Sequence, residues 1–225
     1  NPNFEKIRRY CNSLLNDNQA DNMQEYLANN GKMFKAIIYD ALEQFLLKFN
    51  KKTITLVDWG YSQGIASMLV LDYIREKQLD IEVKKIFLLN ENNLETQRIL
   101  ENLNALKLNE IEIYTSNNLV NEFFNEQELN HNDIQVIEQF NNSINDNLLH
   151  LFINNSFNVS FYEYDWYNFD FEIYHGYFLF ISQKIDIMEK FNNDLMHFKN
   201  ALNKDFQDIS LRNNKIGKFQ RFERI

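Results

Sequence analysis

The chain has 225 residues, a formal net charge of −9 and one cysteine, Cys11. This length suits one α/β domain with an appended segment, and a lone cysteine excludes an intrachain disulfide and a zinc site of the paired-cysteine kind. No apolar run approaches the roughly 20 residues that span a bilayer, and no signal peptide is evident, so the sequence predicts a cytoplasmic protein with no membrane partner.

The first 52 residues are predicted to be a helical extension. Short helices are expected at Phe4–Leu15 and Asn22–Ala28. A clearer helix follows, because apolar residues recur at spacings of three and four, which is the spacing of one helical face. These residues are Phe34, Ile37, Ile38, Ala41, Leu42, Phe45 and Leu46. The predicted domain organisation is therefore an N-terminal helical extension over 1–52 and an α/β domain over 53–225.

Strands and helices alternate from residue 53 onward. Short β-rich runs predict strands at Thr53–Asp58, Glu82–Asn90 and Glu110–Thr115, with helices at Ile65–Lys77 and Leu94–Leu106 between them. Strand–helix–strand order with helices of this length favours a parallel sheet joined by right-handed crossovers.

The second half continues the pattern less regularly. The segment from Asn130 to Asp146 is polar and receives no assignment, apart from the island I-Q-V-I-E-Q-F. His150 lies among apolar residues in a predicted strand, so we expect a hydrogen-bonded core histidine. The remaining predictions are a helix at Leu119–Leu129, strands at Leu148–Asn154 and Tyr177–Ser182, a helix at Ile185–Leu202, and a terminal hairpin turning near Asn213–Gly217.

The segment Thr53–Gly64, T-I-T-L-V-D-W-G-Y-S-Q-G, joins the first strand to the first helix of the α/β domain. The chain turns on Gly60 and Gly64, so backbone N–H groups and the helix dipole can face a polar ligand there. The segment resembles motif I of class I S-adenosylmethionine-dependent methyltransferases, acid-x-Gly-x-Gly-x-Gly. Asp58, Gly60 and Gly64 match, while Ser62 stands where the middle glycine belongs.

The resemblance implies a Rossmann-like fold: a mostly parallel seven-stranded sheet with helices on both faces, closed by a hairpin that inserts one antiparallel strand. It also implies S-adenosylmethionine as the cofactor. Asp58 would order the turn and face the amino-acid end of the cofactor, and Gly60 would let the backbone pass against it. Ser62 would either crowd the methionine–ribose segment or donate a hydrogen bond to it.

Two further positions follow from the same resemblance. The family places an acid for the ribose hydroxyls at the end of the second strand, where this chain has Asn90 followed by Glu91. Either Glu91 takes that role or the site has decayed. Asn154 and Asn155 fall at the end of the fourth strand, on the substrate side. Neither an N-P-P-Y-type tetrad nor a catalytic cysteine of the pyrimidine-carbon type is present, so the catalytic residues and the substrate stay unknown.

Two other functions fit the same residues. Gly60–Gly64 also matches the serine elbow G-x-S-x-G of α/β-hydrolases. In that reading Asp165 or Asp170, followed by His175 or His197, would complete a triad, but only helical sequence precedes Thr53 where that family has strands. The second alternative is a non-catalytic protein-interaction module on a methyltransferase scaffold, which the imperfect motif favours. The isolated histidines show no metal-ligand spacing, so no metal is expected.

The middle third of the chain is acidic and aromatic. No lysine or arginine occurs between Lys107 and Lys184, so a nucleic-acid partner is disfavoured. The aromatic stretch Phe157–Phe171 follows the fourth predicted strand, and we expect Tyr162 and Trp166 to border the mouth of the cleft. The predicted partner is a neutral or cationic small molecule or a protein surface. We also expect the chain to be part of a longer protein or an assembly.

Overall fold

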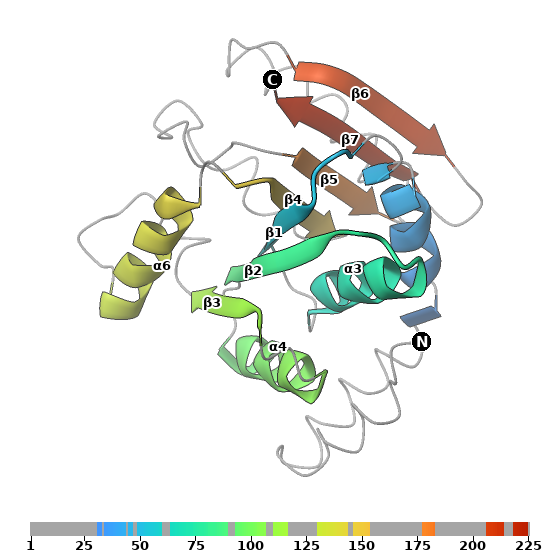
Figure 1. Cartoon of the computed structure of the whole chain (residues 1–225). Coiled ribbons are helices and arrows are strands. Elements are labelled where there is room, and N and C mark those ends of the chain that lie inside the picture. The colour runs from blue at the N-terminus through green and yellow to red at the C-terminus, as the bar shows by residue number, and fades with distance from the viewer. Residues whose placement is uncertain are drawn as a thin grey trace.

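The structure is a computed structural model of the whole chain (Figure 1). It describes residues 31–32, 34–43, 45–46, 49–59, 64–89, 93–106, 110–116, 130–143, 146–153, 177–182, 206–213 and 218–224.

The seven described strands form one sheet in the order β3-β2-β1-β4-β5-β7-β6. The four pairings from β3 to β5 are parallel, and β7 pairs antiparallel with both β5 and β6. The terminal hairpin therefore inserts β7 between β5 and β6, and the prediction of a mostly parallel Rossmann-like sheet is confirmed. The strands are β1 Thr53–Trp59, β2 Glu82–Leu89, β3 Glu112–Ser116, β4 Leu148–Ile153, β5 Tyr177–Ser182, β6 Phe206–Asn213 and β7 Lys218–Arg224.

The described helices of the domain are α3 Ile65–Glu76, α4 Asn93–Ala105 and α6 His131–Asn142. Residues 31–32, 34–43 and 45–46 are also helical and are called the 34–43 helix below. The predicted elements differ from the observed ones by a few residues: β3, expected at Glu110–Thr115, lies two residues later at its start. The predicted helices Leu119–Leu129 and Ile185–Leu202 lie outside the described residues.

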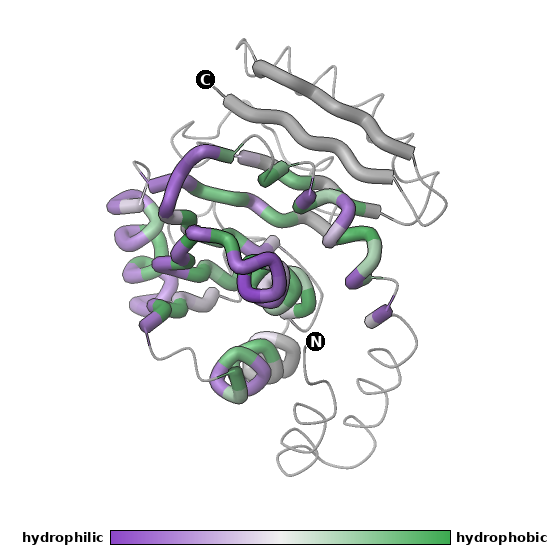
Figure 2. The backbone as a smooth tube through the Cα atoms, turned by 45° about the vertical axis from the view of Figure 1, so that its right-hand side comes forward, coloured by the Kyte–Doolittle hydropathy of each residue, from purple (hydrophilic) through white to green (hydrophobic). Residues whose placement is uncertain are grey.

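One face of the sheet is covered by the 34–43 helix, α3 and α4. Side chains alternate along each strand, so Ile54 and Leu56 of β1 point to this face. They join Ile86 and Leu88 of β2 and Leu149 of β4 in the same buried cluster. Figure 2 shows the matching hydropathy, with hydrophobic stretches in green along the central strands.

The opposite face is covered by α6. Val136 and Phe140 of α6 pack on Val57, Phe87 and Leu89 of the central strands. The predicted arrangement of helices on both faces is thus confirmed (Figure 1).

The position of α6 is a correction, because the sequence analysis left residues 130–146 unassigned. The helix begins with a capping box: Asn130 Oδ1 accepts from the Asp133 amide at 3.0 Å, and Asp133 Oδ2 accepts from the Asn130 amide at 3.2 Å. This reciprocal cap satisfies two N–H groups at the start of the helix. The readable signal was Asn-x-x-Asp before the buried pair Val136 and Phe140.

The 34–43 helix packs deeply into the first face. Its residues Phe34, Ile37, Ile38, Ala41, Leu42 and Phe45 are each at most 1 % exposed. The rings of Phe45 and Phe49 meet Tyr177 of β5 edge-on at 5.2 and 5.4 Å, and Tyr39 meets Tyr73 of α3 at 4.9 Å. This segment therefore shares the core of the sheet, and the predicted domain boundary at residue 52 stays a prediction.

Candidate functional site

The strand order defines the end of the sheet at which a ligand would bind. From β1 the chain moves outward through β2 to β3, then returns to β4 on the other side of β1. In open α/β sheets ligands bind outside the carboxyl ends of the strands at such a switch point. The carboxyl end of β1 carries Asp58 and Trp59, which makes these two residues the starting point for the site.

Asp58 is a buried acid held by the first turn of α3. Its side chain is 5 % exposed, and its neighbours in the sheet are Leu88 of β2 and Leu151 of β4. Oδ2 accepts two hydrogen bonds from Ser67, one from the hydroxyl at 2.7 Å and one from the backbone N–H at 3.2 Å. Ser67 is the third residue of α3, so Asp58 satisfies one of the free N–H groups at that helix start.

Burial raises the pKa of the Asp58 carboxyl to about 6, although the two hydrogen bonds from Ser67 act to lower it. Within the part of the chain that the structure describes, no cation forms an ion pair with Asp58. A buried carboxylate normally needs a paired charge because desolvation disfavours its ionised form. The ionised form of Asp58 would thus gain from a positive group on a ligand.

Gly64 begins α3 in a conformation that favours glycine. Its φ of 72° and ψ of 18° place it in the left-handed region. A Cβ at this position would lie 2.9 Å from Cγ2 of Ile99 on α4, which is closer than side chains pack. Since Gly64 has no side chain to cap the helix, Asp58 supplies an acceptor from the strand instead.

The structure therefore brings two of the predicted site residues, Asp58 and Gly64, to the amino end of α3. The other predicted residues lie outside the described part of the chain, and their roles stay predictions: Gly60, Ser62, Asn90, Glu91, Asn154, Asn155, Tyr162 and Trp166. The residues of the hydrolase alternative lie there too, namely Ser62, Asp165, Asp170, His175 and His197.

His150 is fully buried, and its prediction as a hydrogen-bonded core histidine is confirmed. Its Nδ1 accepts a hydrogen bond from Trp59 Nε1 at 3.0 Å, and the two rings stack with centroids 6.1 Å apart. The accepting Nδ1 carries no proton, because two facing N–H groups would repel each other. His150 thereby fixes Trp59 on the face opposite to Asp58. Sequence analysis missed this partner, which lies 91 positions away.

Polar residues at the end of β3 hold the start of α6. The Ser116 hydroxyl donates to Asp133 Oδ1 at 2.6 Å, and Asn132 Nδ2 donates to the Thr115 carbonyl at 2.9 Å. Ser116 and Asp133 are each 1 % exposed. The hydroxyl of Ser116 thus forms a hydrogen bond within the protein that anchors the start of α6.

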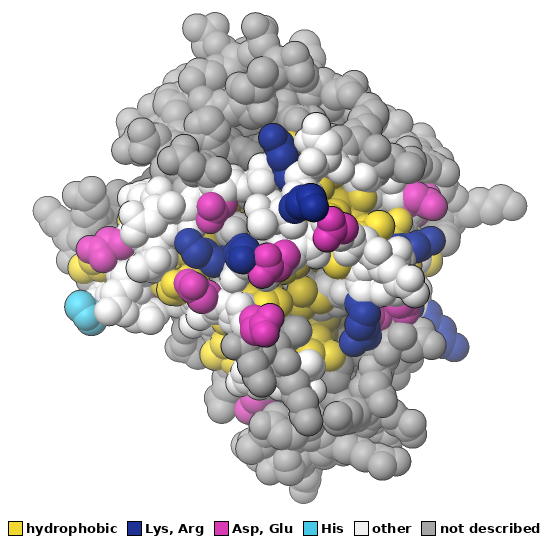
Figure 3. Space-filling view, viewed as in Figure 1, with side chains coloured by type: hydrophobic (Ala, Val, Ile, Leu, Met, Phe, Trp, Pro, Cys, Tyr) yellow, Lys and Arg dark blue, Asp and Glu magenta, His cyan; other side chains and the backbone are white. Residues whose placement is uncertain are grey.

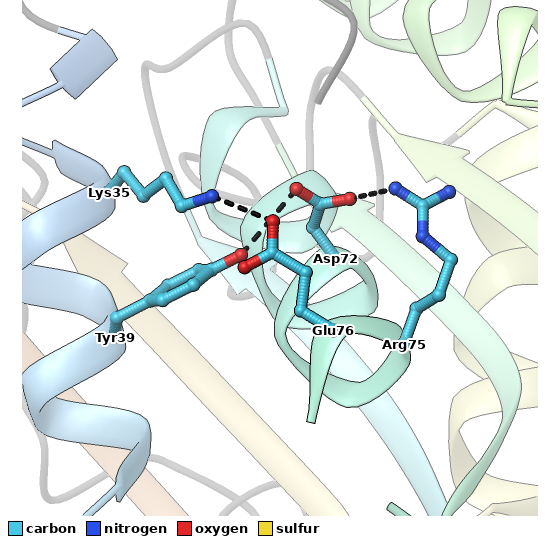
Figure 4. A network of polar contacts seen from close by, with 5 residues as sticks. All are labelled: Lys35, Tyr39, Asp72, Arg75 and Glu76. Carbon is cyan, nitrogen blue, oxygen red and sulfur yellow. Dashed lines mark hydrogen bonds and ion pairs between the residues drawn. The ribbon is translucent and has the colours of Figure 1, made fainter. Parts of the chain in front are cut away.

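The carboxyl-terminal half of α3 carries a second buried acid, Asp72, which is 4 % exposed (Figure 4). Arg75 pairs with Asp72 Oδ1, and the Tyr39 hydroxyl donates to Asp72 Oδ2 at 3.5 Å. Beside it, Lys35 Nζ bonds Glu76 Oε1 at 2.8 Å and lies 4.6 Å from the centroid of the Tyr39 ring. The contacts of Tyr39 with Asp72 and of Lys35 with Glu76 join α3 to the 34–43 helix.

Charges are mixed on the face of the molecule seen in Figure 3, where blue and magenta side chains alternate over the described residues. Exposed ion pairs of the described residues include Lys52–Asp80 at 3.0 Å and Lys84–Glu82 at 2.8 Å. Within the described ranges no three His, Cys, Asp or Glu side chains gather as metal ligands. The helices described there are also too short or too polar to cross a membrane.

Three solved structures named as methyltransferases or methylases are similar to this chain. A proposed S-adenosyl-L-methionine-dependent methyltransferase from Methanococcus maripaludis superimposes with a TM-score of 0.50 and 15 % identity, covering 91 % of each chain. A ribosomal-protein methylase from Lactobacillus delbrueckii subsp. bulgaricus gives a TM-score of 0.42 and 12 % identity, covering 82 % of this chain and 76 % of that one. An rRNA methylase from Streptococcus thermophilus gives 0.39 and 9 %, covering 86 % and 95 %.

The chain has the fold of class I S-adenosylmethionine-dependent methyltransferases, as the sequence predicted. This conclusion rests on the structure from Methanococcus maripaludis, which aligns over nearly the whole length of both chains. The sequence matches no protein-family profile, and no curated protein matches it either.

Proposed function

We propose that the chain binds S-adenosylmethionine at the carboxyl ends of β1 and β2 and acts as a methyltransferase. The observation that carries the proposal is Asp58, a buried carboxylate at the switch point of the sheet whose described neighbours supply no cation. The ammonium group of the cofactor's methionine part would supply that charge. The positive amino end of α3, which follows Gly64, would face the methionine carboxylate.

In this proposal, each of the remaining predicted residues contacts a different part of the cofactor or the substrate. Gly60 would allow close backbone approach, Ser62 would contact the methionine–ribose segment, and Asn90 or Glu91 would hold the ribose hydroxyls. When bound, the cofactor supplies a methyl group on a sulfonium. Methyl transfer depends mainly on alignment of the nucleophile with that methyl group, so we assign positioning of the substrate to Asn154, Asn155, Tyr162 and Trp166.

We propose further that the methyl acceptor is neutral or cationic, or is part of a protein surface. The support is the absence of lysine and arginine between Lys107 and Lys184. Glu110, Glu112, Glu138 and Asp146 from this stretch are exposed. Exposed carboxylates speed the encounter with a cationic partner and repel polyphosphates. Tight, salt-sensitive binding of RNA or DNA would contradict this part of the proposal.

Calorimetric titration with S-adenosylmethionine and its demethylated product tests cofactor binding. We expect heat of binding with the unmodified chain and its loss in Asp58→Asn and in Gly60→Leu. Asp72→Asn is the matched control, because Asp72 is as buried as Asp58 and lies on α3, whose first turn holds Asp58, but is paired within the chain. An absence of binding at millimolar ligand would refute the proposal and favour a non-catalytic interaction module.

A further inference from the structure

We propose that Ser67 is a positioning residue for cofactor binding: it holds Oδ2 of Asp58, so that the ionised carboxylate presents Oδ1 to a cationic group of the ligand. This inference rests on the proposed function. It goes beyond it by assigning a role to a residue outside the glycine motif.

The geometry of the contact supports this role. Both donors of Ser67, its hydroxyl and its amide, converge on one oxygen of Asp58, at 2.7 and 3.2 Å. Ser67 is fully buried, so water does not compete for the contact. Within the described chain, Oδ1 accepts no hydrogen bond. Two donors on one oxygen fix the rotation of the carboxylate and leave its second oxygen for another donor.

The same contact stabilises the charge that the ligand would need. Hydrogen bonds to an ionised carboxylate favour the ionised form, and those to charged groups are the stronger ones. Burial acts in the opposite direction and raises the pKa of Asp58 to about 6. The Ser67 donors therefore decide whether Asp58 is ionised near neutral pH.

No other group of the described chain supplies this charge balance. The titratable groups on the elements packed around Asp58 do not bond to it and do not shift its pKa. On α3, Asp72 and Arg75 pair with each other, and His150 of β4 bonds Trp59 on the other face. The remaining ones with described side chains are Tyr73, Glu76 and Lys77 on α3 or its end, Glu82, Lys84 and Lys85 in the first half of β2, and Glu101 on α4.

The test compares Ser67→Ala with Ser143→Ala. Ser143 is also fully buried and hydrogen-bonded, with its hydroxyl donating to the Gln139 carbonyl at 2.8 Å, but it precedes β4 at the other end of the sheet. The carboxyl ¹³C shift of Asp58 is followed against pH in the unliganded protein, with the signal assigned by its loss in Asp58→Asn. The dissociation constant for S-adenosylmethionine is measured over the same pH range.

We expect Ser67→Ala to raise the titration midpoint of Asp58 by about one pH unit or more, and to weaken cofactor binding about tenfold below that midpoint. Ser143→Ala should move neither quantity. Ser67→Cys, which keeps the size but donates more weakly, should fall between the two.

The two measurements separate the possible failures. An unmoved midpoint of Asp58 in Ser67→Ala overturns the role of Ser67. A midpoint that moves while the pH profile of binding stays fixed shows that Asp58 does not meet the ligand, which also overturns it. If the unmodified chain binds no cofactor, the proposed function fails and the positioning role falls with it, while the midpoint still reports on the contact between Ser67 and Asp58.

Discussion

Two buried aspartates lie at α3, Asp58 against its first turn and Asp72 in its second half, and they differ in how their charge is balanced. Asp58 and Asp72 are 5 % and 4 % exposed. Asp72 has a guanidinium and a phenol from the chain itself, whereas the described partners of Asp58 are the uncharged donors of Ser67. A buried acid that is balanced internally has a structural explanation. Among the described residues, Asp58 at the amino end of α3 has no such charged partner, and this difference is the basis of the proposed contact with a ligand.

The largest expected effects come from Gly64→Ala, which disrupts the amino end of α3, and from its control Ile99→Ala. Gly64→Ala places a Cβ in the left-handed region and against Ile99 at 2.9 Å. Backbone strain and overpacking together should lower the free energy of unfolding by roughly 2–4 kcal/mol. Urea denaturation followed by circular dichroism measures this change.

Ile99→Ala provides the control for the steric part of that loss. Alone it should destabilise by about 2–5 kcal/mol, because it leaves a cavity. In the double variant with Gly64→Ala, the methyl that the new Cβ would contact is gone. The double variant should therefore lose less stability than the sum of the two single losses. Full additivity would mean that backbone strain alone explains the requirement for glycine.

Asp58→Asn should change stability and cofactor binding in opposite directions: it should stabilise the fold at pH 8 and abolish binding. The folded-state pKa of Asp58 is about 6, against 3.8 for the ordinary carboxyl. This group therefore favours the folded state below pH 3.8, and the advantage is lost as pH rises through 6, by on the order of 3 kcal/mol. The amide still accepts from Ser67, so the variant should be more stable than the unmodified chain at pH 8 and similar at pH 4. Denaturation at both pH values measures the difference, and equal stability at pH 8 would contradict it.

Asp72→Asn should have the opposite sign. The variant keeps an acceptor for Tyr39 but loses the ion pair with Arg75, so we expect a loss of about 1 kcal/mol at neutral pH. Cofactor binding should stay unchanged. If Asp72→Asn weakens binding as much as Asp58→Asn does, the contrast between the two aspartates fails.

The smallest expected effect belongs to the ion pair between Lys35 and Glu76. The two side chains are 24 % and 31 % exposed, so solvent screens their attraction. Lys35→Met should lower the free energy of unfolding by about 0.5 kcal/mol, and the difference should shrink in 1 M salt. Lys52→Met at the more exposed pair with Asp80 is the control and should change less.

The fold was readable because strands and helices alternate strictly from Thr53 to Ser116. The helix α6 was not, since its outward face is polar and only Val136 and Phe140 are buried apolar residues. For the site, the pattern around Asp58 and Gly64 identified the turn. The partner Ser67 follows Asp58 by nine positions, beyond the motif, and nothing in its sequence context marks it.

Contacts between distant strands explain the other omissions. Trp59 and His150 meet only because β1 and β4 are neighbours in the sheet. The pairing of Asp72 with Tyr39 depends on where the 34–43 helix packs on α3. Such contacts follow from the order of the strands and the seating of the helices, which periodicity does not specify.

The placement of β7 between β5 and β6 has a consequence for the order of folding. The strand β5 pairs with β4 on one edge, but its other neighbour follows β6 in the chain and must turn back to reach it. Until that happens, Tyr177–Ser182, an uncharged and mostly apolar segment, has an unpaired edge. Edges of this kind pair readily with other chains. We therefore expect the interval between synthesis of β5 and arrival of β7 to be a stage of folding that is exposed to aggregation.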